Sequence, residues 1–257
     1  SIFKPSNEKQ KKLGRILIAA DSAHSFGAEY KNKRSGSFTD VSCFSFHAVK
    51  NLTTSEGGAV CFNLPDAFDH EEIYREFVTI TLHGQSKDAL AKTKKGAWKY
   101  DVVAPGYKCN MTDIQAAMGL VELDRYAENL VRRQEIFHAY DSAFSKIDWA
   151  SLPAHQTRDK VSSHHLYLLR IKDISEAQRD AIIQEIFDQG VSVNVHFQPL
   201  PLLTAYKNLG YEINDFPIAH QKYQTEITLP VYYNLNDTQV AEVINAVVSS
   251  VEKIINR

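Results

Sequence analysis

Two segments with strand-like sequences stand near the start of the chain. Residues 16–20 read Ile-Leu-Ile-Ala-Ala without interruption and end at Asp21, and residues 41–46 (Val-Ser-Cys-Phe-Ser-Phe) read as the next strand. A continuous apolar run such as 16–20 is typical of a parallel strand that is buried on both faces. We therefore predict two strands of a mostly parallel sheet with flanking helices, with Asp21 at the carboxyl end, where open α/β sheets bind ligands.

Helical periodicity follows these strands. Pro65-Asp66 precedes a predicted helix over about residues 67–82, which has one apolar and one charged face. The run Thr112-Asp113-Ile114-Gln115 is a capping box. It predicts a long helix that ends at about residue 146.

The remainder of the chain alternates between strands and helices. The pattern predicts strands over 166–171 and 191–197, and helices over 175–189 and 236–255. We expect an α/β fold in three parts, which are a partial large domain (1–111), a long linking helix (112–146) and a small C-terminal α/β domain (147–257).

Composition is that of an ordinary globular protein and excludes several classes of function. The 257 residues are 44% hydrophobic and 23% charged, and the formal net charge is −2. This charge gives no general attraction to nucleic acid or to an anionic membrane. No apolar run approaches the roughly 20 residues that span a bilayer. The three cysteines, without pairing spacing, indicate reduced thiols and a cytoplasmic protein.

Lys50 is the first candidate for chemistry. It lies between Val49 and Leu52, just before a Glu-Gly-Gly turn, whereas a solvated lysine usually has polar neighbours. Desolvation lowers the pKa of a lysine and frees its amine to attack carbonyl groups. The alternative is a lysine at a strand end that extends its amine into solvent.

Two more side chains are predicted to converge with Lys50. Asp21 ends the first strand, and Ser45 lies near the end of the second. The carboxyl ends of parallel strands share one edge of the sheet, so a carboxylate, a hydroxyl and an amine meet there. A pyridoxal phosphate enzyme needs this set, because the lysine binds the aldehyde, the carboxylate keeps the pyridine nitrogen protonated and hydroxyls hold the phosphate.

Motifs along the chain match one known family in order. They are Asp21-Ser22-Ala23-His24, Phe26-Gly27-Ala28, the run from Ser45 to Asn51, Glu56-Gly57-Gly58, the run from Gly106 to Ala117, the run from Val195 to Pro199, and Leu229-Pro230-Val231. Together they resemble the DegT/StrS-type sugar aminotransferases, fold-type I enzymes that use pyridoxal 5'-phosphate on nucleotide-linked keto sugars. Each motif alone is weak, but their combination is specific.

The resemblance implies cofactor roles for four residues. Lys50 would form the Schiff base with pyridoxal phosphate, and Asp21 would bind the pyridine nitrogen. Ser45 would bind the phosphate. His24, which stands where many relatives have Gln, would bind the phenolic oxygen. Plainer interpretations stay open, namely a helix cap for Asp21, an ordinary strand serine for Ser45 and a structural histidine for His24.

The resemblance also implies substrate and subunit contacts. Asn110 matches an asparagine that reaches the phosphate of the neighbouring subunit, which implies a homodimer with shared active sites. Its alternative is a loop amide near a helix start. Lys108 and Tyr107 are expected to face sugar or phosphate. His196 matches a histidine at the substrate mouth, although Pro199-Leu200-Pro201 departs from the Pro-x-His pattern that follows in the family.

The implied function is an aminotransferase that moves an amino group from glutamate to a keto carbon of a nucleotide-linked keto-deoxy sugar. The run from Ser45 to Asn51 is most similar to members that aminate C4, with C3 as the alternative. Such sugars enter lipopolysaccharide and other polysaccharides. A sugar dehydratase of the family would have histidine in place of Lys50. A non-catalytic member with a regulatory or structural role is the third possibility.

In the family, a long N-terminal portion precedes the strand that ends at Asp21. It carries a Gly-Thr phosphate-binding turn and an aromatic residue that stacks on the cofactor. We therefore expect this chain to be the C-terminal part of a longer protein, with weaker cofactor binding and activity on its own.

Two further patterns have competing interpretations. The lysines within residues 85–105 indicate a solvated loop or, alternatively, a basic flap near a nucleotide diphosphate. His164 and His165 are adjacent, and successive strand residues point to opposite faces, so the two are not expected to share a metal ion. We expect no metal site.

Overall fold

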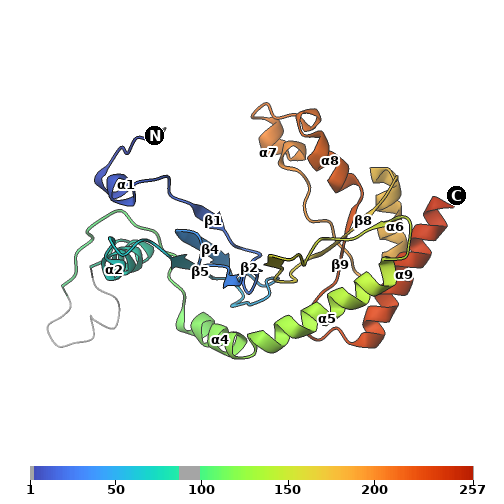
Figure 1. Cartoon of the computed structure of the whole chain (residues 1–257), viewed down its shortest axis with the longest axis horizontal. Helices are drawn as coiled ribbons and strands as arrows, with labels where there is room; N and C mark the ends of the chain where they lie inside the picture. Colours follow the sequence, from blue (N-terminus) through green and yellow to red (C-terminus); the bar gives the residue numbers. More distant parts are fainter. Residues whose placement is uncertain (1–2, 87–98, 257) are drawn as a thin grey trace. The chain divides into compact units, whose positions relative to one another are not determined.

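The computed structural model describes residues 3–86 and 99–256 (Figure 1). Contacts divide the chain into two compact units, which we call unit 1 (Ser1–Arg125) and unit 2 (Tyr126–Arg257). The predicted basic loop at 85–105 lies largely outside the described residues. The three-part domain division stays a prediction.

The sheet of unit 1 has three strands in the order β1-β4-β5, namely β1 (Ala19–Asp21), β4 (Val41–Ser45) and β5 (Gly58–Phe62). β1 and β4 are parallel, with Asp21 opposite Cys43, and β4 and β5 are antiparallel. In its described strands the sheet is therefore mixed rather than mostly parallel.

The first strand differs from the prediction in length and burial. Residues 16–18 are not strand, and the side chains of Ile16 and Ile18 are 70% and 55% exposed. On the neighbouring strand, Ser42 and Phe44 are buried on one face while Cys43 is exposed on the other. The prediction of burial on both faces is thus wrong for the described unit. Its elements cover one face, where Phe26 packs edge-on against Phe44.

The smaller elements of unit 1 follow local sequence signals. β2 (Glu29–Tyr30) and β3 (Lys33–Arg34) form a hairpin whose two turn residues, Lys31 and Asn32, have positive φ angles of 49° and 61°. This is the geometry of a two-residue hairpin turn. α1 (Glu8–Leu13) begins at Asn7, which caps it, and ends at Gly14.

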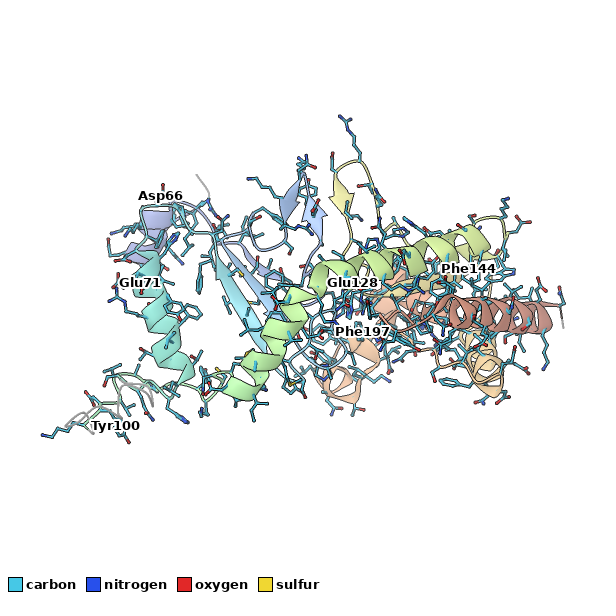
Figure 2. All side chains as sticks on the ribbon, turned by 90° about the horizontal axis from the view of Figure 1, so that it is seen from below. Asp66, Glu71, Tyr100, Glu128, Phe144 and Phe197 are labelled. Atoms are coloured by element: carbon cyan, nitrogen blue, oxygen red, sulfur yellow. The ribbon has the colours of Figure 1, made fainter. Side chains whose placement is uncertain are left out.

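The helix predicted over 67–82 is confirmed as α2 (His70–Thr81). It begins later than predicted because the Asp69 carboxylate accepts a hydrogen bond from the backbone N–H of Glu72, at 3.0 Å, and so caps the helix. Figure 2 labels Asp66 ahead of this helix and Glu71 in its first turn.

The predicted long helix consists of two helices. The capping box is confirmed, because the Thr112 hydroxyl and the Gln115 side chain each accept a hydrogen bond from the other residue's backbone N–H. α4 (Asp113–Asp124) then ends at Arg125, whose N–H is shared between Leu123 and Val121. α5 (Tyr126–Phe144) follows, and Figure 2 labels Glu128 and Phe144 toward its two ends.

Unit 2 is built on an antiparallel sheet in the order β6-β8-β9. Its strands are β6 (Ala150–Ser151), β8 (Tyr167–Ile171) and β9 (Glu226–Leu229), and β7 (Lys160–Val161) lies apart from them. Its helices after α5 are α6 (Glu176–Asp188), α7 (Thr204–Lys207), α8 (Pro217–Gln224) and α9 (Asp237–Ile255), with short 3-10 turns at Leu200–Leu202 and Ile213–Asp215.

The core of unit 2 lies between one face of this sheet and α5, α6 and α9. Along β8 the buried residues alternate, so that Tyr167, Leu169 and Ile171 enter the core. The predicted strand at 166–171 and the helices at 175–189 and 236–255 are confirmed. The predicted strand at 191–197 is wrong, because only Asn194 pairs with the sheet, through a bridge to Thr228.

Candidate active site

The end of the β1–β4 pair holds most of the residues predicted for chemistry. Asp21 lies opposite Cys43, and Ser45 follows two residues later on β4. Side chains two residues apart on a strand share a face, so Asp21 and Ser45 lie on the same, exposed face of the sheet. The Asp21 carboxylate accepts a hydrogen bond from the N–H of Ala23 at 3.1 Å.

An ion pair that the sequence did not reveal fixes this strand pair. The carboxylate of Asp40, only 3% exposed, accepts hydrogen bonds from both terminal nitrogens of Arg15 at 2.5 Å and from the N–H of Ile18 at 2.8 Å. The Arg15 hydrogen bonds, and then that from Ile18, hold the pKa of Asp40 below its usual value despite its burial. Asp40 therefore joins the segment before β1 to the start of β4.

Lys50 lies in a tight turn immediately after β4. Its N–H donates to the carbonyl of His47 at 2.9 Å, and Thr54 N–H donates to Phe46 at 2.9 Å, which closes the loop. The Lys50 side chain is half-buried, and Leu52, two residues later in the same loop, is buried. Among residues 3–86 and 99–256, no ion pair or hydrogen bond engages its amine, so the nucleophile is not neutralised by a carboxylate.

The turn that follows Lys50 requires glycine. A Cβ added to Gly58 would lie 2.5 Å from the carbonyl oxygen of Phe44, closer than real Cβ atoms approach an oxygen. The Gln115 side chain donates to the carbonyl of Glu56 at 2.8 Å. The start of α4 is thereby attached to the loop that carries Lys50.

His24 follows the same end of β1. The backbone N–H of Ser22 donates to the carbonyl of Cys43 at 2.8 Å and so extends the hydrogen bonding between β1 and β4 by one residue. The N–H of Ser25 then donates to the carbonyl of Ser22 at 3.0 Å, which forms a turn. His24 lies half-buried inside that turn. The structure therefore gathers Asp21, His24, Ser45 and Lys50 in the segments that leave one end of two neighbouring strands.

Tyr107, Lys108 and Asn110 form a separate exposed group beside the end of α2. The backbone N–H of His83 donates to the carbonyl of Tyr107 at 2.9 Å, and the backbone N–H of Cys109 donates to the carbonyl of Thr81 at 3.0 Å. The Lys108 amine donates to the Asn110 side-chain oxygen. Within the described part of the chain, these three side chains form no hydrogen bond with the Asp21–Lys50 group.

His196 belongs to unit 2 and is held by two residues that the sequence did not single out. The ring nitrogen Nδ1 of His196 lies 2.9 Å from the hydroxyl of Thr228. The backbone N–H of His196 donates to the Glu226 carboxylate at 2.9 Å. Burial raises the pKa of Glu226. No periodic signal marks these partners because they lie about thirty residues from His196.

The adjacent histidines are both buried ahead of β8 rather than in it. His164 is 1% exposed and has a φ of 52°, and among the described residues neither of its ring nitrogens has a hydrogen-bond partner. Burial, followed by the charges of His155 and His138, lowers its pKa to about 4. In the described ranges, no three His, Cys, Asp or Glu side chains are grouped as metal ligands.

The residues at the end of β1 and β4 fit pyridoxal phosphate chemically. The site offers one amine free of ion pairs, one exposed carboxylate and a strand-end hydroxyl whose only hydrogen bond in the described structure is a 3.4 Å contact from the N–H of His47. Lys50 would hold the aldehyde carbon, Asp21 the ring nitrogen and Ser45 the phosphate.

Comparison with known proteins decides the family. Residues 9–248 match the DegT/DnrJ/EryC1/StrS aminotransferase family. The chain belongs to this family. Its α/β fold is that of the family's solved structures. The family's cofactor is pyridoxal phosphate, since one relative, Spr1654 of Streptococcus pneumoniae, is known in PLP and PMP forms.

Three relatives illustrate the similarity. Spr1654 of Streptococcus pneumoniae, to which sugar aminotransferase activity is attributed, is 48% identical in its PMP form with a TM-score of 0.92, over 98% of this chain and 63% of that one. SpsC of Bacillus subtilis, a spore coat polysaccharide biosynthesis protein, is 36% identical over 90% of this chain. The UDP-4-amino-4,6-dideoxy-N-acetyl-beta-L-altrosamine transaminase of Campylobacter jejuni is 32% identical over 93% of this chain.

This chain is shorter than the family members it matches. It spans 59% of the length of SpsC and 60% of that of the Campylobacter transaminase. Of the helices that the structure describes, none has the length and apolarity needed to cross a lipid bilayer.

Proposed function

We propose that this protein transfers an amino group from glutamate to the C4 keto carbon of a nucleotide-linked keto-deoxy sugar, with pyridoxal phosphate attached at Lys50. The observation that carries the proposal is the half-buried Lys50 amine, free of ion pairs in the described structure, in a turn after the strand next to Asp21. The transaminase name of a 32% identical relative supports the substrate class.

Each residue has one task in this mechanism. When bound, pyridoxal phosphate supplies a protonated ring that accepts the electron pair released as a substrate C–H bond breaks. Asp21 would keep the ring nitrogen protonated through its negative charge. Lys50 would hold the cofactor aldehyde, and its Nζ would take up and return the proton of the substrate carbon. Ser45 and His24 would orient the ring by binding the phosphate and the phenolic oxygen.

Asn110 is proposed to bind the phosphate in the neighbouring subunit of a homodimer, with Lys108 and Tyr107 beside it at the sugar or phosphate and His196 at the substrate mouth. We also propose a cytoplasmic location. The residue assignments are supported by the motifs around them, and the proposed homodimer predicts that activity falls when the protein is diluted below the dimer dissociation constant.

An absorbance titration tests the proposal. Pyridoxal phosphate added to the wild-type chain should produce a visible band that glutamate bleaches, because the amino group moves to the cofactor. Lys50→Ala should abolish the band, whereas Lys33→Ala, an exposed lysine of the same unit, should leave it unchanged. A band that survives in Lys50→Ala, or one that glutamate does not bleach, would contradict the proposal.

A further inference from the structure

Unit 2 contains a pocket on the face of its sheet that points away from the core. Because side chains alternate along β8, Leu168 and Arg170 lie on this face, opposite the buried Tyr167, Leu169 and Ile171. The loop from His196 to Pro199 and the helix α8 complete the walls. The cavity measures about 270 Å³, slightly less than the roughly 300–1,000 Å³ of most small-ligand pockets.

Two cations line this pocket without a close ion pair. Arg170 comes from β8 and Lys222 from the last turn of α8, and neither lies within 4 Å of a carboxylate oxygen in the part of the chain that the structure describes. Other arginines of unit 2 behave differently. Arg179 lies 2.7 Å from Asp180, and Arg132 lies 2.8 Å from Asp237. Cations from separate elements that face one cavity are suited to an anionic ligand.

Among the described residues that line the pocket, Glu226 is the only one with a carboxylate. It lies opposite Arg170 in the β8–β9 pairing. Its two oxygens accept hydrogen bonds from the Thr228 hydroxyl and the His196 N–H. The carboxylate is thus engaged by the protein and buried, with one positive charge directly across the ladder. The formal charge of the lining remains positive because Lys222 adds a second cation.

The same pocket offers aromatic surface. Tyr223 lies with its ring 4.7 Å from the Arg179 guanidinium, which holds it in place. Phe197, labelled in Figure 2, is 63% exposed at the pocket wall. Aromatic faces bind flat heterocycles such as nucleobases by stacking. Charge and aromatic surface together match a nucleotide rather than a simple inorganic ion.

We propose that this pocket binds the diphosphate of a nucleotide-linked ligand between Arg170 and Lys222, with the base against Phe197 or Tyr223. The identity of the ligand as the nucleotide part of the sugar substrate rests on the proposed function. Arg170 contributes two parallel N–H donors, which suit a phosphate oxygen pair, and Lys222 contributes a point charge. Neither residue takes part in the chemistry at Lys50.

Calorimetric titration of the full chain with UDP, inorganic pyrophosphate and uridine tests this inference. We expect UDP to bind more tightly than pyrophosphate, and uridine to bind most weakly. Arg170→Gln and Lys222→Gln should each weaken UDP binding about tenfold or more, the effect of losing one charge-assisted hydrogen bond. Arg158→Gln and Lys146→Gln remove the same charges from exposed positions outside the pocket and should change the affinity less than twofold.

Three results would overturn the inference. The first is equal weakening by the control variants, which would mean general charge attraction. The second is pyrophosphate binding as tight as that of UDP, which would mean a site for free anions. The third is unchanged UDP binding in both pocket variants while circular dichroism shows them folded.

The outcome is separable from that of the proposed function. Lys50→Ala should bind UDP with the wild-type affinity, because the pocket does not contain Lys50. If UDP binds through Arg170 and Lys222 while the wild-type chain takes up no pyridoxal phosphate, the pocket is supported and the aminotransferase proposal fails. If the cofactor binds at Lys50 and no variant affects UDP, the reverse holds.

Discussion

The two units of this protein bury their apolar side chains to very different extents. Among the described residues of unit 1, Phe44 and Leu52 are the only buried hydrophobic side chains, whereas unit 2 has a continuous core between its sheet and three helices. The residues proposed for chemistry nevertheless lie mainly in unit 1. Local turns and the Asp40–Arg15 ion pair, rather than a large core, determine their positions.

The largest difference between the units should appear on removal of an aromatic ring. Phe144→Ala, at a fully buried position of unit 2, should lower the free energy of unfolding by about 3–5 kcal/mol, because it leaves a cavity in the core. Phe38→Ala, at an exposed position of unit 1, should cost less than about 1 kcal/mol. Urea unfolding followed by circular dichroism measures both, and equal losses would contradict the comparison.

Acid should destabilise unit 2 through His164. Its pKa is about 4 in the folded state, against an ordinary value of 6.5, so the unfolded chain binds more protons between these values. Stability is therefore retained above pH 6.5 and is lost as the pH falls toward 4. The full loss is about 3 kcal/mol if the shift is converted directly.

His164→Asn provides the control for this pH dependence. Asparagine tolerates the positive φ of this position and does not titrate, so the slope of unfolding free energy between pH 6.5 and 4 should become shallower. The absolute stability of the variant is not the criterion. An unchanged slope would show that other groups cause the acid sensitivity.

The ion pair of unit 1 should have an intermediate effect. Asp40→Ala leaves the N–H of Ile18 without its acceptor and frees Arg15, which should cost about 1–3 kcal/mol. Hydrogen exchange at Ile18 and Ser22 should quicken. Asp66→Ala, an exposed carboxylate before α2, should leave both amides unchanged. If both amides exchange at the wild-type rate in Asp40→Ala, Asp40 does not hold the segment before β1 in place.

The smallest expected effects are those of the helix caps. Ser175→Ala in unit 2 and Thr112→Ala in unit 1 each remove a capping box, for a cost of about 1 kcal/mol. In unit 2 the loss should appear in global unfolding, because α6 is part of the core. In unit 1 it should appear as faster exchange in the first turn of α4. If only Thr112→Ala lowered the global free energy of unfolding, the contrast between the two units would be contradicted.

Sequence reasoning succeeded where the signal is local. The sequence predicts the capping box at Thr112, because the interacting residues are three positions apart, and it predicts the helix over 175–189 that a second capping box at Ser175 begins. The strand predicted over 166–171 is confirmed at Tyr167–Ile171, because its signal lies within the segment itself. The placement of Asp21 and Ser45 at the same end of β1 and β4 agrees with the rule that parallel strands end at one edge of a sheet, and the convergence of Lys50 with them stays a prediction.

It failed where distant residues decide the structure. The Arg15–Asp40 pair joins residues far apart in the chain, and no periodicity marks it. The predicted strand at 191–197 has the right side chains but only one bridging partner. The apolar residues 16–18 were predicted to be buried on the assumption that both faces of their strand are covered, which is a property of the surroundings rather than of the run itself.

Mass spectrometry after borohydride reduction tests the central claim most directly. The chain is incubated with pyridoxal phosphate, reduced to make the attachment permanent and digested with a protease. The account predicts that the added cofactor mass lies on Lys50, and that Lys50→Ala removes the adduct without transferring it to Lys108 or another lysine. An adduct distributed over exposed lysines, or none on Lys50, would contradict the claim.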